Sequence, residues 1–328
     1  MISPALQLIG GYWLEEIRPA DLPILEQLPD LAETLTGAGQ DSFTDLAVEY
    51  QRLFGFNLPP YESVFIDPSA MLNAPASARV QQRYRQAGWK PLTGWRFAAP
   101  DHLGLELHAL AYARQQPDPS PGLLLLTAHL ALWAPVFLLT LKRLDPHPFY
   151  ARLGDLTLAL ILETLPADPL PIDADPFPSL PPAPVYRGTY QPPPGQPVPN
   201  AAELYTEPSL MGESLQQVLR RLLTPRQAGM FLTRQDLAAA GTALELPGGV
   251  GDREHMLMAL FRLAAQYELL PELFAYLVSL CQHSLSAYSD LERAYPAWAV
   301  YAQAWRNRLE VTIQFLRQLD LQALASSA

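Results

Sequence analysis

The chain has 328 residues, of which 49 % are hydrophobic and 17 % are charged. This composition excludes a disordered chain, which cannot bury enough apolar surface to offset its ordering entropy. The net charge of −11 argues against a protein that grips phosphate backbones, so we expect no nucleic-acid partner. A single cysteine, Cys281, excludes an intramolecular disulfide and multi-cysteine metal sites. The N-terminus shows no signal peptide, and together these features predict a cytoplasmic protein.

Helical patterns dominate the chain before residue 166. Apolar residues spaced three and four apart over Asp41–Phe54 predict a helix with one apolar face. Three further helices are predicted over Arg79–Ala87, Asp101–Gln115 and Tyr150–Leu165. Gly88 is placed to end the first of these, and Asp101 is placed as the N-cap of the second.

Residues Leu123–Leu141 contain no charged side chain over 19 positions, which is long enough for a transmembrane helix. His129 lies in the middle of this run and Pro135 interrupts it. Because proline is better placed in the first turn of a helix than inside one, we predict two buried helical pieces that meet near Trp133–Pro135. We therefore expect no membrane insertion.

Proline marks the clearest boundary, because 13 of the 34 prolines lie between Pro166 and Asn200. Proline lacks a backbone N–H and fixes φ, so this stretch predicts an extended, semi-rigid linker. The alternative is a long strap that lies on the surface of one domain. The predicted division is an N-terminal domain over residues 1–165, a linker over 166–200 and a C-terminal helical region over 201–328.

The C-terminal region is also predicted to be helical. Helix starts are indicated by first-turn prolines or capping side chains at Thr224–Pro225, Thr233–Asp236, Asp252, Pro271 and Pro296. The glycine-rich stretch Gly248–Gly251 is interpreted as a loop that ends at the Asp252 cap. Alternating strand patterns are not evident, so the predicted fold class is all-α.

The densest polar cluster is Asp101–His108. On a helix, His102 and Glu106 are i, i+4 neighbours and could share a metal ion. This leaves open a metal-binding enzyme centred on Asp101, His102 and Glu106, against the simpler alternative of a capped helix start with a His–Glu pair. His102 could also change its charge near neutral pH.

Aromatic residues gather ahead of this cluster: Tyr50, Phe54, Phe56, Tyr61 and Phe65. Aromatic side chains give a large contact area at low entropy cost and suit peptide recognition. From spacing alone, packing in a core is the simpler interpretation.

Five short motifs occur in order over about residues 40–165. They are Tyr50–Phe54 with Pro60–Asp67, then Arg79–Gly88, then Pro100–Leu103 with Glu106, then His129–Leu130 with Trp133 and Phe137, and finally Pro148–Tyr150 with Leu153 and Leu156–Thr157. In this order they resemble the TorD/DmsD-type maturation chaperones for molybdoenzymes. The proline-rich stretch and the C-terminal region lie outside the resemblance.

The resemblance implies an all-helical TorD-like chaperone domain without enzymatic turnover, catalytic residues, metal or other cofactor. Such a chaperone binds the apo catalytic subunit of a molybdopterin oxidoreductase, its twin-arginine signal peptide, or both, in the cytoplasm until the cofactor is inserted. The resemblance also allows a homodimer formed by helix exchange. It places client contacts at Tyr50, Leu53, Phe54, Tyr61, Phe65, Asp101, His102 and Glu106.

The C-terminal region leaves another alternative open, a helical adaptor that works through residues 201–328 while the N-terminal domain only docks it. A chaperone cut at about Pro181 should keep client binding. For the added region the hypothesis is one of three roles: a second client-binding surface, a lid over the groove or a dimerisation module.

Overall fold

The computed structural model describes residues 2–35, 39–91, 99–170, 175–180, 209–210 and 213–326. Within these residues the chain is almost entirely helical, which confirms the all-α class. The first part contains α1 (Ile2–Leu14), η1 (Pro19–Asp21), α2 (Leu22–Leu25), α3 (Pro29–Glu33), α4 (Gln40–Tyr50), η2 (Gln51–Asn57), α5 (Glu62–Ile66), α6 (Pro75–Ala87), α7 (Leu103–Ala113), α8 (Ser120–Leu125), η4 (Leu126–Leu130), α9 (Ala131–Arg143) and α10 (Pro148–Glu163).

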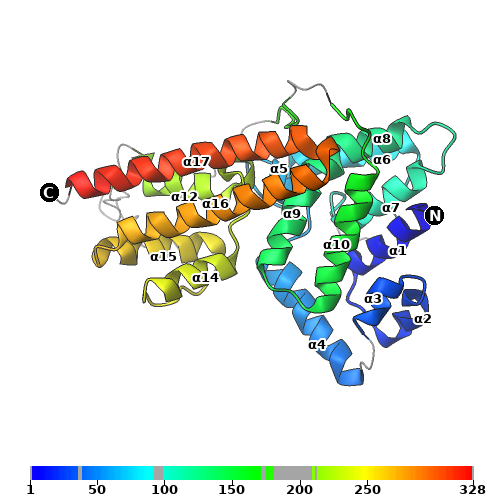
Figure 1. Cartoon of the computed structure of the whole chain (residues 1–328), viewed down its shortest axis with the longest axis horizontal. Coiled ribbons are helices and arrows are strands. Elements are labelled where there is room, and N and C mark those ends of the chain that lie inside the picture. Colours follow the sequence, from blue (N-terminus) through cyan, green and yellow to red (C-terminus); the bar gives the residue numbers. More distant parts are fainter. Residues whose placement is uncertain are drawn as a thin grey trace, which may run out of the picture.

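The second part begins with a short antiparallel pairing of β1 (Ser209–Leu210) with β2 (Glu213–Ser214). It continues with α12 (Leu215–Leu223), α13 (Pro225–Ala228), α14 (Arg234–Ala243), α15 (Arg253–Gln266), α16 (Leu270–Ala294), η5 (Pro296–Trp298) and α17 (Ala299–Ser326). Figure 1 shows α16 and α17 as a long antiparallel pair that reaches from α14 and α15 across to α9 and α5.

Most predicted helix ends are confirmed. Gly88 ends α6 in the left-handed conformation, with φ of 73°. Thr233 and Asp236 form a reciprocal capping box at the start of α14, and the Asp252 side chain accepts from the His255 N–H at the start of α15. Side chains that satisfy the unpaired N–H groups of a first turn act locally, which is why the sequence reveals them.

Three predicted helix features are wrong in detail. The helix expected over Asp41–Phe54 is α-helical only to Tyr50 and continues as the π-helix η2. Helix α7 begins at Leu103, and its N-cap is His102, whose Nδ1 accepts from the Gly104 N–H. The helix start at Thr224–Pro225 is real, but α13 has four residues and no cap bond from the Thr224 side chain.

Helix α1 has no counterpart among the predicted elements. It packs against α7 at Gly10 and Gly104, where a Cβ added to Gly104 would lie 2.4 Å from the Gly10 carbonyl oxygen. Trp13 at its end is fully buried, and its indole N–H donates to the Thr157 hydroxyl at 2.9 Å. The close approach of the two backbones depends on glycine in both helices.

Helices α8, η4 and α9 form one run, Ser120–Arg143, that is long and apolar enough to cross a membrane, but 78 % of its most apolar window is buried inside the protein. The prediction of a break near Pro135 is wrong. The α-helix is interrupted instead by the π-helix Leu126–Leu130, and Pro135 lies inside α9. Burial of this kind is typical of the core helix of a soluble protein.

The turn η5 and the start of α17 dock onto this run through three buried aromatic side chains. The Trp298 indole donates to the Ala131 carbonyl at 2.8 Å, and Tyr301 and Trp305 donate to carbonyls of η4 and α9 at 2.7 Å each. In a regular helix the Ala131 carbonyl would accept from residue 135, but Pro135 has no N–H. Trp298 therefore supplies the hydrogen bond that the proline removes.

We expect Trp298→Phe to lower the free energy of unfolding by about 2 kcal/mol, because it leaves a buried carbonyl unpaired. The cost should shrink in a Pro135→Ala background, where alanine supplies the N–H. Trp305→Phe is the matched control, since its acceptor on Leu132 lies four residues before Val136, which has an N–H. Urea unfolding of the wild type, Trp298→Phe, Pro135→Ala, their double variant and Trp305→Phe measures these costs, and an equal cost of Trp298→Phe in both backgrounds would contradict the explanation.

The described part of the predicted linker includes residues 175–180, and this piece lies on the C-terminal region. The Phe177 ring packs edge-on against Trp305, with ring centroids 4.9 Å apart. The guanidinium groups of Arg308 and Arg226 lie 3.6 and 5.6 Å from its centroid. Such a contact is what the surface-strap alternative requires. Residues 171–174 and 181–208 lie outside the described residues, and the division into domains stays a prediction.

Candidate functional site

Two of the predicted motifs meet where Tyr61 pairs with His102. These residues form an isolated antiparallel bridge, and their rings stand edge to face at 4.8 Å. Asp101 accepts from the Ser63 N–H at 2.7 Å. The carboxylate therefore sits at the start of α5, where a negative charge favours the helix terminus. Asp101 fixes α5 in place, although it was expected to cap the following helix.

A buried polar cluster lies behind this junction. Glu62 Oε2 and His129 Nδ1 are 2.8 Å apart, and both side chains are fully buried. Arg79 Nη1 lies 3.6 Å from the other Glu62 oxygen. Glu106 is also fully buried, and its pKa is raised well above the ordinary value by burial and by the charges of Glu62 and Asp101. Buried acidic side chains thus lie close to one histidine and one arginine.

The raised pKa of Glu106 predicts a pH-dependent stability. Folded Glu106 keeps its proton at pH values where the unfolded chain has lost it, so stability falls as pH rises above the ordinary pKa of 4.5. Glu106→Gln should therefore lose less stability than the wild type between pH 5 and pH 8. Urea unfolding at both pH values measures this, with the exposed Glu310→Gln as control, and an unchanged pH dependence would contradict it.

Tyr50 and Phe54 belong to an aromatic cluster inside the N-terminal part. The Tyr50 hydroxyl donates to the Trp13 carbonyl at 2.9 Å. The Phe54 ring lies 5.3 Å from Trp13, 5.7 Å from Tyr150 and 6.3 Å from Phe137. The apolar face predicted for this helix therefore packs into the core, which is the simpler of the two interpretations of its spacing.

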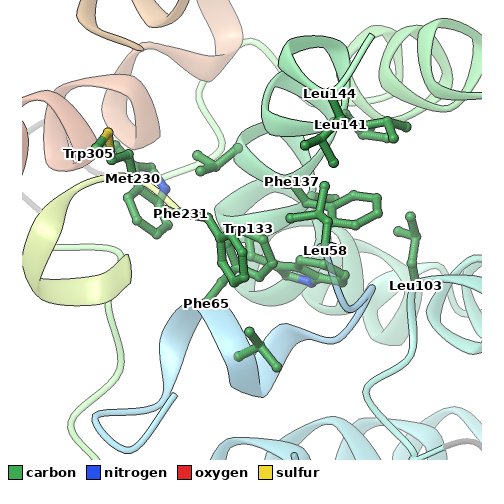
Figure 2. Close-up of a cluster of buried hydrophobic side chains, with 14 of the residues drawn as sticks. Leu58, Phe65, Leu103, Trp133, Phe137, Leu141, Leu144, Met230, Phe231 and Trp305 are labelled. Carbon is green, nitrogen blue, oxygen red and sulfur yellow. The ribbon is translucent and has the colours of Figure 1, made fainter. Parts of the chain in front are cut away.

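Phe65 is buried between the two parts of the chain, as Figure 2 shows. Its ring lies 5.5 Å from Trp133 and 6.0 Å from Phe137, and it stacks on Phe231 at 5.2 Å with an interplanar angle of 30°. The guanidinium of Arg253 covers the Phe231 ring at 4.0 Å. The face that Phe65 presents is thus occupied by the C-terminal region.

Arg143, at the end of α9, strengthens this contact. One of its terminal nitrogens donates to the Phe231 carbonyl and to Asp236 Oδ2, both at 2.9 Å. Asp236 also belongs to the capping box of α14. The ion pair is only slightly exposed, so it is screened less than a surface pair. Arg143 therefore links the N-terminal core to the loop that carries Phe231.

The predicted client residues divide by exposure. Tyr50 and Tyr61 are partly exposed, whereas the remaining six are buried: Leu53, Phe54, Phe65, Asp101, His102 and Glu106. Sequence reasoning did not single out the Glu62–His129 pair or Phe231. The available signal for the Glu62–His129 pair was a histidine inside an uncharged apolar run, because a buried polar side chain needs a hydrogen-bond partner.

His102 does not act as a sensor near neutral pH, because burial lowers its pKa to about 3. Among the described residues, no group of three or more histidine, cysteine, aspartate or glutamate side chains could hold a metal ion. Cys281 is buried, and burial raises the pKa of its thiol to about 12. The thiolate that reacts or binds metal is therefore strongly disfavoured there.

Residues 19–138 match the family model described as nitrate reductase delta subunit. Over these residues the chain is similar to the TorD-like chaperone family, to which this model belongs. Members of this family are soluble maturation factors for molybdoenzymes and not catalytic enzymes. The match covers a little over a third of the chain, begins at η1 and ends within α9. No curated protein matches the chain.

Proposed function

We propose that this protein is a cytoplasmic maturation chaperone without enzymatic turnover. It binds the apo catalytic subunit of a molybdopterin oxidoreductase, its twin-arginine signal peptide, or both, until the cofactor is inserted. The family match over residues 19–138 carries the proposal, because the family serves molybdoenzyme maturation. The net charge of −11 supports it, since an acidic surface speeds encounter with a basic peptide.

The predicted client set takes two roles in this proposal. Tyr50 and Tyr61, which are partly exposed, would touch the client. The six buried members would hold these two in position, as Asp101 does through Ser63 and α5. A client that contacts Phe65 directly would have to displace Phe231 from it. The homodimer by helix exchange remains a prediction.

An affinity pull-down of the tagged full-length chain, from cells grown under respiration that induces molybdoenzymes, tests the function. Mass spectrometry should find one molybdopterin oxidoreductase catalytic subunit enriched over an unrelated protein with the same tag. Tungstate in the growth medium blocks formation of active molybdenum cofactor and should increase the captured amount, because the apo-enzyme accumulates. Failure to enrich any such subunit under several respiratory conditions would reject the proposal.

A further inference from the structure

An irregular segment, residues 229–233, joins α13 to α14 and carries the ring that covers Phe65. We call it the Phe231 segment. Its three central residues, Met230, Phe231 and Leu232, are all buried. The segment lies outside the part of the chain that matches the family model, which ends at residue 138. A buried segment that is neither helix nor strand must find its hydrogen-bond partners in other elements.

Side chains of three helices bind the carbonyl groups of the Phe231 segment. Tyr288 on α16 donates to the Gly229 carbonyl at 2.9 Å. Arg253 on α15 donates to the Leu232 carbonyl at 3.1 Å, and Arg143 on α9 binds the carbonyl between them. The ring of the segment stacks against the N-terminal part, as Figure 2 shows. The segment is therefore held as an extended peptide is held in a groove, by one ring and by its carbonyl groups.

The N–H groups of the Phe231 segment are less well satisfied. Those of Met230, Phe231 and Leu232 form no hydrogen bond with any other described residue, whereas the Thr233 N–H donates to Asp236. A buried N–H without a partner is costly, and the cost disappears when the segment leaves its place and water reaches it. This cost makes the segment easier to displace than a fully bonded element of the same size.

The C-terminal region is also docked by contacts that lie outside the Phe231 segment. Trp298, Tyr301 and Trp305 of η5 and α17 bind carbonyl groups of η4 and α9. Gly229, at one end of the segment, has a φ of 84°, a conformation in which glycine lets the chain change direction. The segment can therefore move away from Phe65 while α17 stays in place.

We propose that the Phe231 segment is an internal competitor, which a client peptide with a large apolar side chain displaces from Phe65. This inference rests on the proposed chaperone function and names the chemistry of the client segment. That chemistry is an extended, uncharged stretch with one aromatic ring, because Phe65 offers a flat apolar surface and Arg143 offers a donor for a backbone carbonyl. Phe65 thereby has a second role, as a contact that only release of the segment uncovers.

Fluorescence anisotropy with the purified full-length chain tests the competition. The probe is a fluorescein-labelled copy of residues 227–234, Gln-Ala-Gly-Met-Phe-Leu-Thr-Arg, and the control peptide carries alanine in place of phenylalanine. The chain should bind the probe about tenfold more tightly than the control, because burial of the ring supplies most of the contact with Phe65. Equal binding of the two peptides, or no binding of either, would overturn the proposal.

Two tyrosine variants show whether release of the Phe231 segment limits binding. Tyr288→Phe removes the hydrogen bond to the Gly229 carbonyl and leaves Phe65 untouched. It should tighten binding of the probe about fivefold, because one lost hydrogen bond raises the released fraction by about that factor. Tyr301→Phe is the matched control, since it removes one buried hydrogen bond of the same kind from the docking of α17 and should leave the affinity unchanged.

Two outcomes of this comparison would overturn the proposal. An equal gain in both variants would mean that the whole C-terminal region dissociates. A dimer of Tyr288→Phe in size-exclusion chromatography, without tighter binding of the probe, would mean that a second copy of the chain takes the place of the segment. If either variant fails to fold, the comparison of the two peptides on the wild type still decides.

The failure of this competition and the failure of the chaperone function can be told apart. If the wild type and Tyr288→Phe capture equal amounts of an oxidoreductase from the same lysate, the competition is rejected and the function is kept. Phenylalanine-dependent binding of the probe without capture of any oxidoreductase would keep the competition for Phe65 and reject the function.

Discussion

A chain cut after Leu180 should fail to accumulate as a soluble monomer, contrary to the expectation from the sequence that a chain cut at about Pro181 keeps client binding. The cut removes four fully buried aromatic residues that cover η4, α9 and Phe65, namely Phe231, Trp298, Tyr301 and Trp305. Full burial of one large apolar side chain contributes roughly 2 kcal/mol. The summed loss approaches the whole stability of a typical domain, which is about 5–15 kcal/mol. The exposed face would also be apolar and continuous, which favours aggregation.

Size-exclusion chromatography of the soluble fraction measures this outcome. Co-expression of residues 201–328 as a separate chain is the control, because it offers the same side chains to the exposed face. It should restore a soluble complex of the two fragments. A truncated chain that stays monomeric, with the same unfolding midpoint as the full chain, would show that the C-terminal region is dispensable for the N-terminal fold.

His129→Leu should lower the free energy of unfolding by about 3 kcal/mol, because it leaves the buried Glu62 carboxyl without its hydrogen-bond partner. Glu62 and His129 are both fully buried and lie 2.8 Å apart, and Arg79 at 3.6 Å is the remaining partner of Glu62. The double variant Glu62→Leu/His129→Leu should cost less than the sum of its single changes. Apolar groups of similar volume can replace a buried pair with little loss.

Urea unfolding of the wild type, both single variants and the double variant completes the cycle. Adding Arg79→Ala to each of these four chains shows how much of the remaining stabilisation of Glu62 comes from this half-buried arginine. Strictly additive costs would mean that Glu62 and His129 contribute independently, which would contradict their buried contact as the source of the effect.

Local signals explain why much of the fold could be predicted. The Thr233–Asp236 capping box, the Asp252 cap and the Gly88 terminus each act within a few residues. Such interactions form in any context that permits a helix, so composition and spacing reveal them. The order of five motifs over residues 40–165 indicated the resemblance to the TorD/DmsD-type chaperones, and the match of residues 19–138 to the family model confirms that resemblance.

The candidate site was harder to predict, because aromatic spacing does not say what a ring will contact. Tyr50 and Phe54 have the pattern expected of both a groove and a core, and the structure packs Phe54 into the core. Asp101 is well placed to cap the helix that follows it, yet it accepts from Ser63, which is 38 residues away in the sequence. Where a side chain has two possible partners, only the tertiary packing decides which of them it contacts.

The sequence by itself determined the all-α class, the positions of most helices and the family resemblance of the N-terminal part, because these depend on local periodicity and short motifs. The tertiary structure decided which side chains are accessible. Phe65 stacks on Phe231 and Glu62 pairs with His129 across long stretches of chain. Pairings at such separations depend on how whole helices pack, which no local pattern encodes. For that reason only the folded chain shows that the C-terminal region covers α9 and Phe65.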